Sequence, residues 1–366
     1  MKVAIVYDRL NKIGGAERVL QVLHEIWPEA PFFTTVYNEK KALWAQGFQV
    51  NSSFMQKLPF AKSKHEFYPW LTPFIFESFD FSNFDFVFSV TSAEAKGIIT
   101  NTQTTHVCYC LTPTRYLWSS NEDYIKNAGF NNLNFLAKAV FGFLTPILKK
   151  WDYVASQRPD TMIAISNTVK TRIKKYYQRV STVIYPPVDT EKFRHKQEIN
   201  LSNPEDFFLI VSRLVPYKRI DLAIRAFNKL GFPLKIIGVG SQQARLQHMA
   251  KDNIEFFGQL TDDDLIGYYQ RCCAVVMPQK EDFGLVSVEA QAAGKPVIGF
   301  AKGGVRETVI DGQTGVLFKK QKVEEIIKAV YKFKSMRFDR DICFSNAKKF
   351  DKKVFIKKMK AIVEGR

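Results

Sequence analysis

The sequence lacks the spacings that hold structural metal ions or cross-link a fold. Its five cysteines include no paired C-x2-C motifs, and its five histidines show no H-x3-H spacing. Structural zinc sites and disulfide frameworks depend on such patterns. We therefore expect neither of them in this protein.

Long apolar runs are also missing. The most apolar stretch, residues 135–151, is interrupted by Lys138 and Pro146 and is shorter than the ~20 residues that cross a bilayer. It is compatible with a buried helix or with an anchor lying in the membrane interface. The phenylalanine-rich residues 67–88 could likewise belong to the core or to an exposed loop. A core strand is predicted at Asp85–Val90.

We expect no secretion leader at the start of this sequence. The chain begins MKVAIVYDRL, with a strand from the third residue, which leaves no room for a charged region, an apolar region and a cleavage site. We expect a cytoplasmic protein.

No complete dinucleotide-binding fingerprint is present. Gly238-Val239-Gly240-Ser241 follows a predicted strand, but Gln243 stands where a third glycine belongs. Asp262-Asp263-Asp264 is typical of a helix start and not of a D-x-D motif that holds a metal. We expect no cofactor, neither NAD nor a divalent metal ion.

The sequence does contain alternating strand and helix patterns, which are typical of an α/β fold with parallel sheets. Its 366 residues exceed what one core usually supports. Helices are predicted at 16–26, 133–149 and 168–177 in the first half. The predicted strands are 2–7, 31–37, 84–91, 105–110, 161–166, 182–185, 207–212, 234–238, 254–257, 274–277, 296–300 and 315–318.

A domain boundary is predicted at Tyr185-Pro186-Pro187-Val188-Asp189, because two prolines end the preceding strand and stiffen the connection. We expect an N-terminal Rossmann-like domain at 1–187 and a C-terminal one at 188–346. Apolar residues among lysines predict an amphipathic helix over Ala347–Val363, within a final segment 347–366. A free basic tail is the alternative for that segment.

The formal net charge is +17. Such a charge favours polyanions or an anionic membrane face. No zinc-finger spacing, RNP-like strand or recognition helix accompanies it, so nucleic acid is not expected as a partner. We expect contact with an anionic membrane surface.

Residues 281–289, EDFGLVSVE, place Glu281 and Glu289 around the predicted start of a helix after a buried strand. The backbone N–H groups of a helix start attract anions, and a carboxylate accepts hydrogen bonds from sugar hydroxyls. A phosphorylated sugar would satisfy both groups. For the spacing alone, ordinary exposed residues near a helix start are the alternative.

A second cluster lies in residues 207–221, where an apolar strand leads into a loop with Arg213 and Lys218. The planar fork of arginine and the compact charge of lysine suit a diphosphate. A solvated basic loop is the alternative. Near the amino terminus, Gly14 and Gly15 follow the first strand, where a backbone without Cβ atoms approaches a phosphate or sugar closely, or forms a plain turn.

These segments together resemble the family 4 retaining glycosyltransferases. The resemblance rests on IGGAERV, SRLVPYKRID, IIGVGS, IEFFGQLTDDD, EDFGLVSVEAQAAGKPVIGF and GGVRETVIDGQTG, in that order along the chain. It implies the GT-B fold, in which two doubly wound Rossmann-like domains face each other across a cleft, with the final helix returning to the first domain.

The resemblance also implies roles for single residues. Arg213 and Lys218 would hold the diphosphate, Glu289 the ribose and Glu281 the transferred sugar. The remaining donor-binding candidates are the turn Phe283-Gly284-Leu285 through its backbone, the loop at Phe257 and Gly258 near the nucleobase, and Gly14 with Gly15. Glu281, Arg213 and Lys218 are the catalytic candidates.

One position departs from the family pattern. Relatives commonly have histidine in an H-T-P segment after a first-domain strand, whereas this chain has Leu111 before Thr112 and Pro113. Leucine cannot donate a hydrogen bond, which puts activity in question unless Thr112 or Arg115 supplies the contact. These two are the acceptor-side candidates. His106, at a strand start, is interpreted as structural.

The predicted function is a metal-independent retaining hexosyltransferase, peripheral on the inner face of the cell membrane. It would move a hexose from a nucleotide sugar to a glycan or polyprenyl-lipid-linked acceptor in cell-envelope polysaccharide assembly, such as that of lipopolysaccharide. Segments such as CYCLTPTRYLW and YPPVD resemble mannosyltransferases, which favours GDP-mannose, with UDP-hexose as the second donor. A sugar-nucleotide epimerase of the same fold and a catalytically impaired sugar-nucleotide or membrane-binding scaffold are the alternatives.

Overall fold

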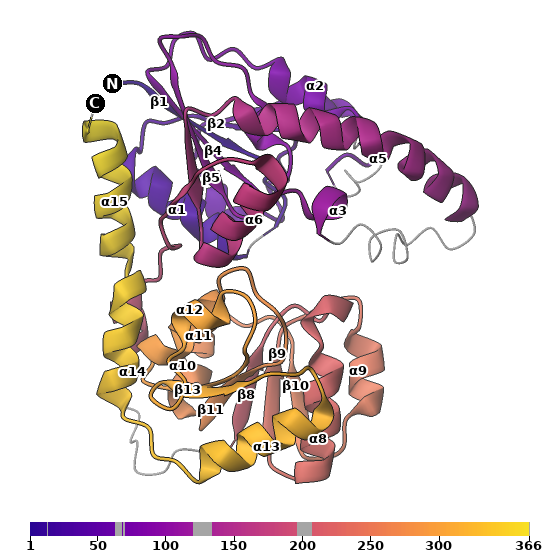
Figure 1. Ribbon diagram of the computed structural model, residues 1–366, viewed down its shortest axis with the longest axis vertical. Coiled ribbons are helices and arrows are strands. Elements are labelled where there is room, and N and C mark those ends of the chain that lie inside the picture. Colours follow the sequence, from indigo (N-terminus) through magenta and orange to yellow (C-terminus); the bar gives the residue numbers. More distant parts are fainter. Residues whose placement is uncertain (13, 63–67, 69, 120–133, 196–206, 366) are drawn as a thin grey trace. The chain divides into compact units, whose positions relative to one another are not determined.

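The computed structural model describes residues 1–12, 14–62, 68, 70–119, 134–195 and 207–365, with side chains for all of them except 134–141 and 195. Contacts divide the chain into two units (Figure 1). Unit 1 comprises Met1–Tyr185 with Ile356–Arg366, and unit 2 comprises Pro186–Phe355. Ile13, Phe67 and Leu133, which belong to predicted segments, lie outside the described residues.

Unit 1 contains a parallel sheet in the order β3-β2-β1-β4-β5-β6-β7. The strand order reverses beside β1, so the loops after β1 and β4 diverge at the carboxyl edge. The strands are β1 (Val3–Tyr7), β2 (Phe32–Thr34), β3 (Val50–Ser52), β4 (Phe86–Thr91), β5 (Thr105–Cys110), β6 (Thr161–Ala164) and β7 (Thr182–Val183).

The helices of unit 1 are α1 (Gly15–Ile26), α2 (Thr72–Glu77), α3 (Arg115–Trp118), α5 (Asn134–Gln157) and α6 (Asn167–Tyr177), with 3-10 turns η1 (Leu43–Ala45), η2 (Phe54–Lys57) and η4 (Ala95–Gly97). The helix predicted to end at Lys149 continues to Gln157, past Pro146. Trp151 Nε1 donates to Glu77 at 2.8 Å and ties α5 to α2. In the described part of the chain, no helix is long and apolar enough to cross a membrane.

Unit 2 contains a second parallel sheet, in the order β10-β9-β8-β11-β12-β13. Its strands are β8 (Phe208–Val211), β9 (Leu234–Ile237), β10 (Ile254–Phe257), β11 (Ala274–Met277), β12 (Val297–Phe300) and β13 (Gly315–Phe318). Alternate residues such as Ile210, Ile236 and Val276 form one core cluster. The residues between them, such as Leu209 and Val275, are equally buried, so both faces of the sheet are covered.

Helices cover the sheet of unit 2. They are α7 (Thr190–His195), α8 (Ile220–Leu230), α9 (Gln243–Met249), α10 (Asp262–Arg271), α11 (Leu285–Ala292), α12 (Val305–Thr308), α13 (Val323–Lys334) and α14 (Arg340–Ala347), with 3-10 turns η5 (Pro216–Lys218) and η6 (Lys348–Phe350). Figure 1 shows α8 and α13 side by side, and both contribute to the same core cluster.

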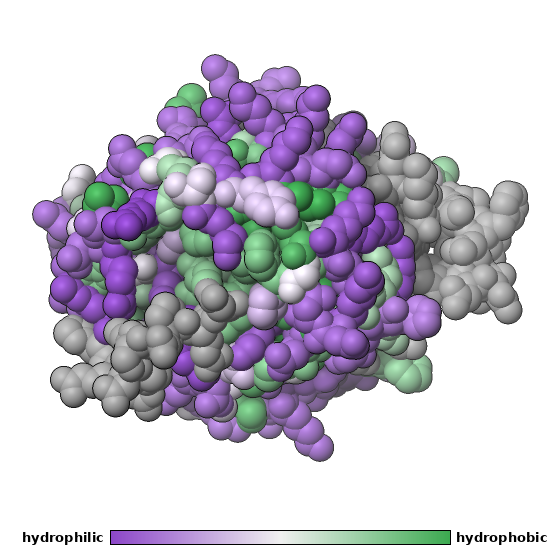
Figure 2. Space-filling model, turned by 90° about the horizontal axis from the view of Figure 1, so that it is seen from below, coloured by the Kyte–Doolittle hydropathy of each residue, from purple (hydrophilic) through white to green (hydrophobic). Residues whose placement is uncertain are grey.

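The face of the molecule that is seen from below is mainly hydrophilic, with apolar groups between the polar ones (Figure 2).

The single helix predicted over Ala347–Val363 is wrong in one respect. The chain forms α14, η6 and then α15 (Lys352–Glu364), with extended backbone at Asp351 between them. Asp351 interrupts the helix because its carboxylate accepts from the backbone N–H of Lys353 at 2.8 Å and from the hydroxyl of Thr190. The residue therefore ends one helix and begins the next.

Candidate functional site

The loops after β8 and β11 meet at the point where the strand order of unit 2 reverses. Arg213 and Lys218 lie in the loop after β8, and Glu281 lies in the loop after β11. Open α/β sheets bind ligands at this point of the carboxyl edge. The topology thus brings together the three residues predicted to be catalytic.

Glu281 is held by two donors on one oxygen. Lys218 Nζ forms an ion pair with Oε1, and Gln279 Nε2 donates to the same atom at 2.8 Å. The side chains of Lys218 and Glu281 are 13% and 17% exposed, so the pair is partly removed from water. Among the described residues, no hydrogen-bond or ionic partner is recorded for Oε2 of Glu281.

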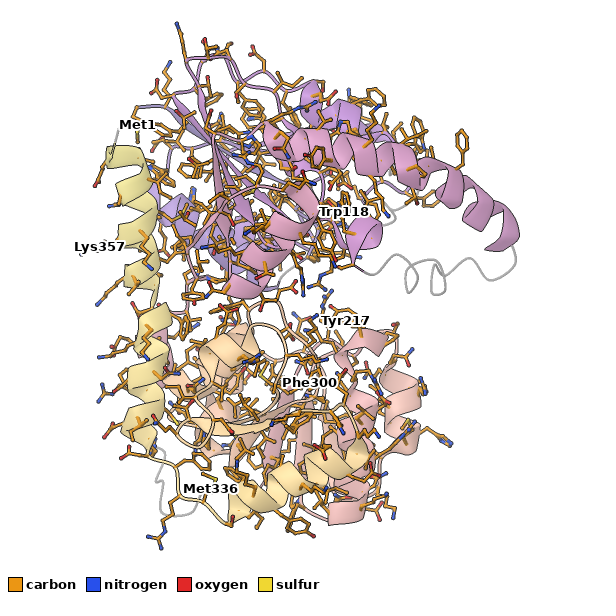
Figure 3. All side chains as sticks on the ribbon, in the orientation of Figure 1. Met1, Trp118, Tyr217, Phe300, Met336 and Lys357 are labelled. Atoms are coloured by element: carbon orange, nitrogen blue, oxygen red, sulfur yellow. The ribbon has the colours of Figure 1, made fainter. Side chains whose placement is uncertain are left out.

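Tyr217, which is labelled in Figure 3, contacts both cations of the β8 loop. Arg213 Nη2 donates to the Tyr217 hydroxyl, and Lys218 Nζ lies 5.5 Å from the centre of the Tyr217 ring. Arg213 itself is exposed. Its guanidinium is therefore both pre-positioned and accessible to an anion.

The β8 loop is packed closely against the loop after β9. A Cβ atom on Gly238, where φ is +135°, would lie 2.0 Å from the carbonyl oxygen of Ser212. A Cβ on Gly240 would lie 2.3 Å from that of Leu214. These glycines thus serve close backbone packing, which explains why they resemble a fragment of a nucleotide fingerprint.

The predicted helix after the β11 loop is α11, which begins at Leu285 after Gly284. Gly284 has φ +98°, a left-handed conformation that favours glycine. The first N–H groups of a helix have no intrahelical partner, so this end suits an anion. Phe283 is buried, and its ring packs against Phe350, which makes its side chain part of the core.

The loop after β12 supports the loop after β11. The Gly304 N–H donates to the carbonyl of Glu281 at 2.8 Å, and Gly303 has φ +78°. A Cβ on Gly303 would lie 2.1 Å from the same carbonyl oxygen. The backbone of Glu281 is therefore fixed as firmly as its side chain.

Glu289 lies on α11 and is 4% exposed. Its Oε2 accepts a hydrogen bond from the hydroxyl of Tyr269 at 2.7 Å, and the Tyr269 ring contacts Phe193 edge-on. A buried carboxylate that accepts a hydrogen bond from a fixed donor has a defined orientation. Tyr269, on α10, was not identified from the sequence.

Phe257 is the last residue of β10 and Gly258 follows it; β10 is separated from β8 by β9. The Gly238 N–H is shared between the carbonyls of Phe257 and Gly258, at 3.1 Å each. Phe257 is half-buried against Tyr268, with ring centres 5.0 Å apart, and Gly258 is exposed. The backbone of this loop lies at the same edge as the basic loop.

In unit 1, Gly14 and Gly15 lie at the corresponding reversal of strand order, between β1 and β4. Both are exposed, and Gly14 has extended backbone before α1. Glu17, in the first turn of α1, is buried and accepts a hydrogen bond from Tyr7 at 2.7 Å. The side chain of Glu17 thereby holds the helix start against β1.

Thr112 and Arg115 lie in the segment after β5. Thr112 is buried and accepts from Arg172 at 3.1 Å, whereas Arg115 is half-exposed at the start of α3. Leu111 is half-buried, and its N–H donates to the carbonyl of Thr91 at 2.8 Å.

Asp152 of α5 fixes this segment. Its carboxylate accepts from Lys96, from Thr114 at 2.7 Å and from Trp118 at 2.7 Å. Lys96 and Asp152 are 1% and 0% exposed. Burial disfavours the ammonium, but the charge of Asp152 and its hydrogen bond, with smaller contributions from Cys110 and Cys108, together outweigh the burial and raise the pKa of Lys96.

A second buried carboxylate, Glu94, lies nearby in unit 1. It forms an ion pair with Arg9 at 2.9 Å and accepts from the Tyr116 hydroxyl. Burial raises the pKa of Glu94. In the described part of the chain, no group of three His, Cys, Asp or Glu side chains could hold a metal ion.

The structure places Arg213, Lys218 and Glu281 in contact or in neighbouring loops of unit 2. It separates the side chain of Phe283 from them. Sequence reasoning missed Gln279, Tyr269 and Asp152, although Gln279 stands only two positions before Glu281.

Comparison with known proteins finds a family match over most of unit 2. Residues 190–350 match the family model described as glycosyl transferases group 1. An uncharacterized glycosyltransferase of Methanocaldococcus jannaschii is 29% identical over 204 residues, which cover 54% of this chain and 56% of that protein. A GDP-mannose-dependent alpha-(1-6)-phosphatidylinositol monomannoside mannosyltransferase of Mycolicibacterium smegmatis is 31% identical over 170 residues, covering 40% and 44%. The match thus spans about half the length of these curated relatives.

Solved structures resemble the whole chain. HepE of Anabaena, crystallised in complex with UDP, has a TM-score of 0.72 at 18% identity and covers 100% of both chains. This similarity confirms the fold class expected from the sequence, which is α/β with two Rossmann-like parallel sheets, as in GT-B glycosyltransferases.

Proposed function

We propose that this protein is a glycosyltransferase that moves a hexose from a nucleotide-diphosphate sugar to a glycan or lipid-linked acceptor. One observation carries the proposal: Arg213, Lys218 and Glu281 converge at the carboxyl edge of the unit 2 sheet, beside the start of α11. Cations and helix-start N–H groups bind a diphosphate, and a carboxylate beside them binds sugar hydroxyls. The family match over residues 190–350 supports the same reaction.

In the proposed reaction, the bond between the anomeric carbon and the phosphate oxygen breaks, and a bond from that carbon to an acceptor oxygen forms. The leaving diphosphate gains negative charge and takes the proton of the acceptor hydroxyl. Arg213, Lys218 and the N–H groups of Gly284 and Leu285 stabilise that charge. Lys218 has three N–H donors, so it can contact a phosphate without releasing Glu281.

The other donor contacts follow the sheet order. Glu289 orients the ribose, and the backbone at Phe257 and Gly258 meets the nucleobase. Gly14 and Gly15 of unit 1 permit close approach of the donor, and Thr112 and Arg115 serve the acceptor. We propose retention of the anomeric configuration without a metal ion, with the leaving phosphate assisting the acceptor.

GDP-mannose is the proposed donor. The similarity to a GDP-mannose-dependent mannosyltransferase of Mycolicibacterium smegmatis supports it. The HepE complex with UDP supports a UDP-hexose as the alternative. We further propose a role in cell-envelope polysaccharide assembly, at the inner membrane face.

A nucleotide-binding scaffold without transferase activity is the second candidate. Leu111 favours it, because its side chain has no donor at the position where the resembling family commonly has histidine. An enzyme would release nucleoside diphosphate from its donor, whereas a scaffold would bind the donor unchanged and an epimerase would return an altered sugar nucleotide.

The test is a thermal-shift screen against GDP, UDP and ADP, followed by turnover of GDP-mannose and UDP-glucose. We expect one nucleotide to raise the melting temperature of the wild type. Arg213→Ala with Lys218→Ala should abolish that shift and remove at least ~3 kcal/mol of transition-state stabilisation, about 100-fold or more in kcat/KM.

The matched control is Lys328→Ala with Lys332→Ala, which removes the same charge from exposed positions of α13. It should leave binding and turnover intact. An unchanged response of the Arg213 and Lys218 double variant, or no nucleotide binding by the wild type, would refute the proposal.

A further inference from the structure

Gln279 is a buried polar residue to which neither the sequence motifs nor the proposed reaction assigns a role. It follows β11 by two residues and is 2% exposed. Its Nε2 donates to Glu281 Oε1 at 2.8 Å. Its own Oε1 is buried, and no hydrogen-bond partner for it is found among the described residues.

An unpaired buried carbonyl of this kind is expensive. Native proteins pair nearly all buried polar atoms, and an unsatisfied one costs about 1–3 kcal/mol. An apolar side chain at position 279 would avoid that cost. The presence of an amide at position 279 therefore indicates that its N–H group, which donates to Glu281, is needed.

The two donors to Glu281 act on the same oxygen. Lys218 and Gln279 both contact Oε1, and no partner of Oε2 is recorded in the described residues. A carboxylate bound on one oxygen from two directions cannot rotate freely, and its second oxygen stays available to a ligand. Because Gln279 is neutral, it adds this restraint without adding charge beside the diphosphate site.

We infer that Gln279 is a positioning residue that fixes the Glu281 carboxylate so that Oε2 accepts a hydroxyl of the donor hexose. The inference rests on the proposed function, since it assigns Glu281 to the hexose. It concerns only the hexose end of the donor. Loss of Gln279 should therefore weaken catalysis and hexose recognition without weakening binding of the nucleoside diphosphate alone.

The test compares the wild type with Gln279→Met, which keeps a side chain of similar length and removes the amide. The probes are GDP, UDP, GDP-mannose and UDP-glucose, with calorimetry for binding and nucleoside diphosphate release for turnover. We expect kcat with the active donor to fall about 10- to 100-fold, in the range of a lost oriented contact. The Kd of the matching nucleoside diphosphate should stay within about twofold.

Deoxy analogues of the donor hexose give a measurement that would not change if Gln279 had only a structural role. The wild type should discriminate against the analogue that lacks the hydroxyl bound by Glu281, because the site is then left with an unpaired group. Gln279→Met should lose most of that discrimination. Equal discrimination in both proteins would overturn the inference.

Gln279→Glu provides a second variant with a distinctive pH profile. The neighbouring Glu281 raises the pKa of the introduced carboxyl, which donates to Glu281 only while it is protonated, and Lys218 opposes that shift. Turnover relative to the wild type should therefore recover as the pH falls from about 8 to about 6. A flat ratio, or a loss of nucleoside diphosphate binding equal to the loss of turnover, would overturn the inference. Failure of the wild type to bind any of the nucleotides would instead refute the proposed function.

Discussion

Glu281 and Glu289 lie eight positions apart in one segment, but their surroundings differ. Glu281 is 17% exposed and is held by Lys218 and Gln279, whereas Glu289 is 4% exposed and accepts from the hydroxyl of Tyr269. A cation-paired carboxylate suits a group close to a charged leaving phosphate. A carboxylate with a neutral donor suits an uncharged diol such as a ribose.

His106 gives a prediction about stability at the residue scale. It is fully buried on β5, with Nε2 2.8 Å from Ser89 Oγ, and Nδ1 has no hydrogen-bond partner among the described groups. Burial, followed by the charges of Arg179 and Arg158, lowers the pKa of His106 to about 3. The imidazole is therefore neutral in the folded protein, in agreement with its interpretation as structural.

Because the unfolded chain binds a proton on His106 near its ordinary pKa of about 6.5, stability is full above that value and falls as the pH drops toward about 3. We expect unfolding at pH 5 to be easier than at pH 7.5 by about 2 kcal/mol on this account. His106→Gln should remove that part of the pH dependence in urea titrations. His248→Gln, at an exposed position, should leave it in place; equal profiles for wild type and His106→Gln would contradict the assignment.

At the residue scale, motifs predicted the charged members of the site better than their neutral partners. Arg213, Lys218 and Glu281 belong to segments whose composition is unusual for their position. Gln279 and Tyr269 are ordinary residue types, and only the fold reveals that each donates to a predicted carboxylate. The buried position of Phe283 could not be foreseen, because its partner Phe350 lies far along the chain.

At the scale of elements, glycines set the distance between loops at the carboxyl edge of unit 2. Gly303 and Gly231 both have positive φ, +78° and +72°, but only Gly303 meets another backbone atom. Comparing the two positions therefore separates the cost of a side chain at positive φ from the cost of a steric clash.

We predict that Gly303→Ala destabilises unit 2 by about 2–4 kcal/mol, because the new Cβ would collide with the Glu281 carbonyl in addition to the strain at positive φ. Gly231→Ala, with open space around it, should cost about 1 kcal/mol. Urea titration of both variants is the measurement. Similar losses in the two variants would show that the β11 and β12 loops are not in rigid contact.

Helices and strands were predicted well where they are long and buried. They were predicted less well where single side-chain contacts determine where an element ends. The predicted strands are all present, to within three residues at either end. The short strand β3 and the helix α2 were missed, because three and six residues give little periodicity. The break at Asp351 depends on Thr190, a partner that no local pattern reveals.

At the scale of the whole molecule, the net charge of +17 predicts attraction to anionic lipid surfaces. Unit 1 adds exposed apolar side chains, among them Phe74 at 65% and Phe143 at 75% exposure. We expect co-sedimentation with vesicles containing phosphatidylglycerol but not with pure phosphatidylcholine. Raising the salt from about 0.1 to about 0.5 M should release most of the protein, because the Debye length shortens.

Phe74→Ser should weaken vesicle binding, because it removes apolar surface available for insertion. Tyr331→Ser, on α13 of unit 2 and 57% exposed, is the control and should not. Equal binding to charged and uncharged vesicles would contradict the expected attraction to anionic lipid. Equal effects of the two substitutions would contradict a role for unit 1 in contacting the bilayer.

The two units repeat one plan, since in each sheet the strand order reverses beside the first strand of that unit. The alternating pattern of the sequence predicted parallel sheets in both halves. It could not predict that the reversal in unit 2 would bring Arg213 and Glu281 into neighbouring loops. That grouping follows from strand order, which is a tertiary property.

The ion pair between Lys218 and Glu281 also bears on competition from small anions. With Lys218 paired to Glu281, the net positive charge that an orthophosphate or sulfate meets is that of exposed Arg213, beside the N–H groups at the start of α11. A simple inorganic ion therefore gains little at this edge. Where inorganic phosphate is abundant, occupancy is left to ligands large enough to engage several loops at once.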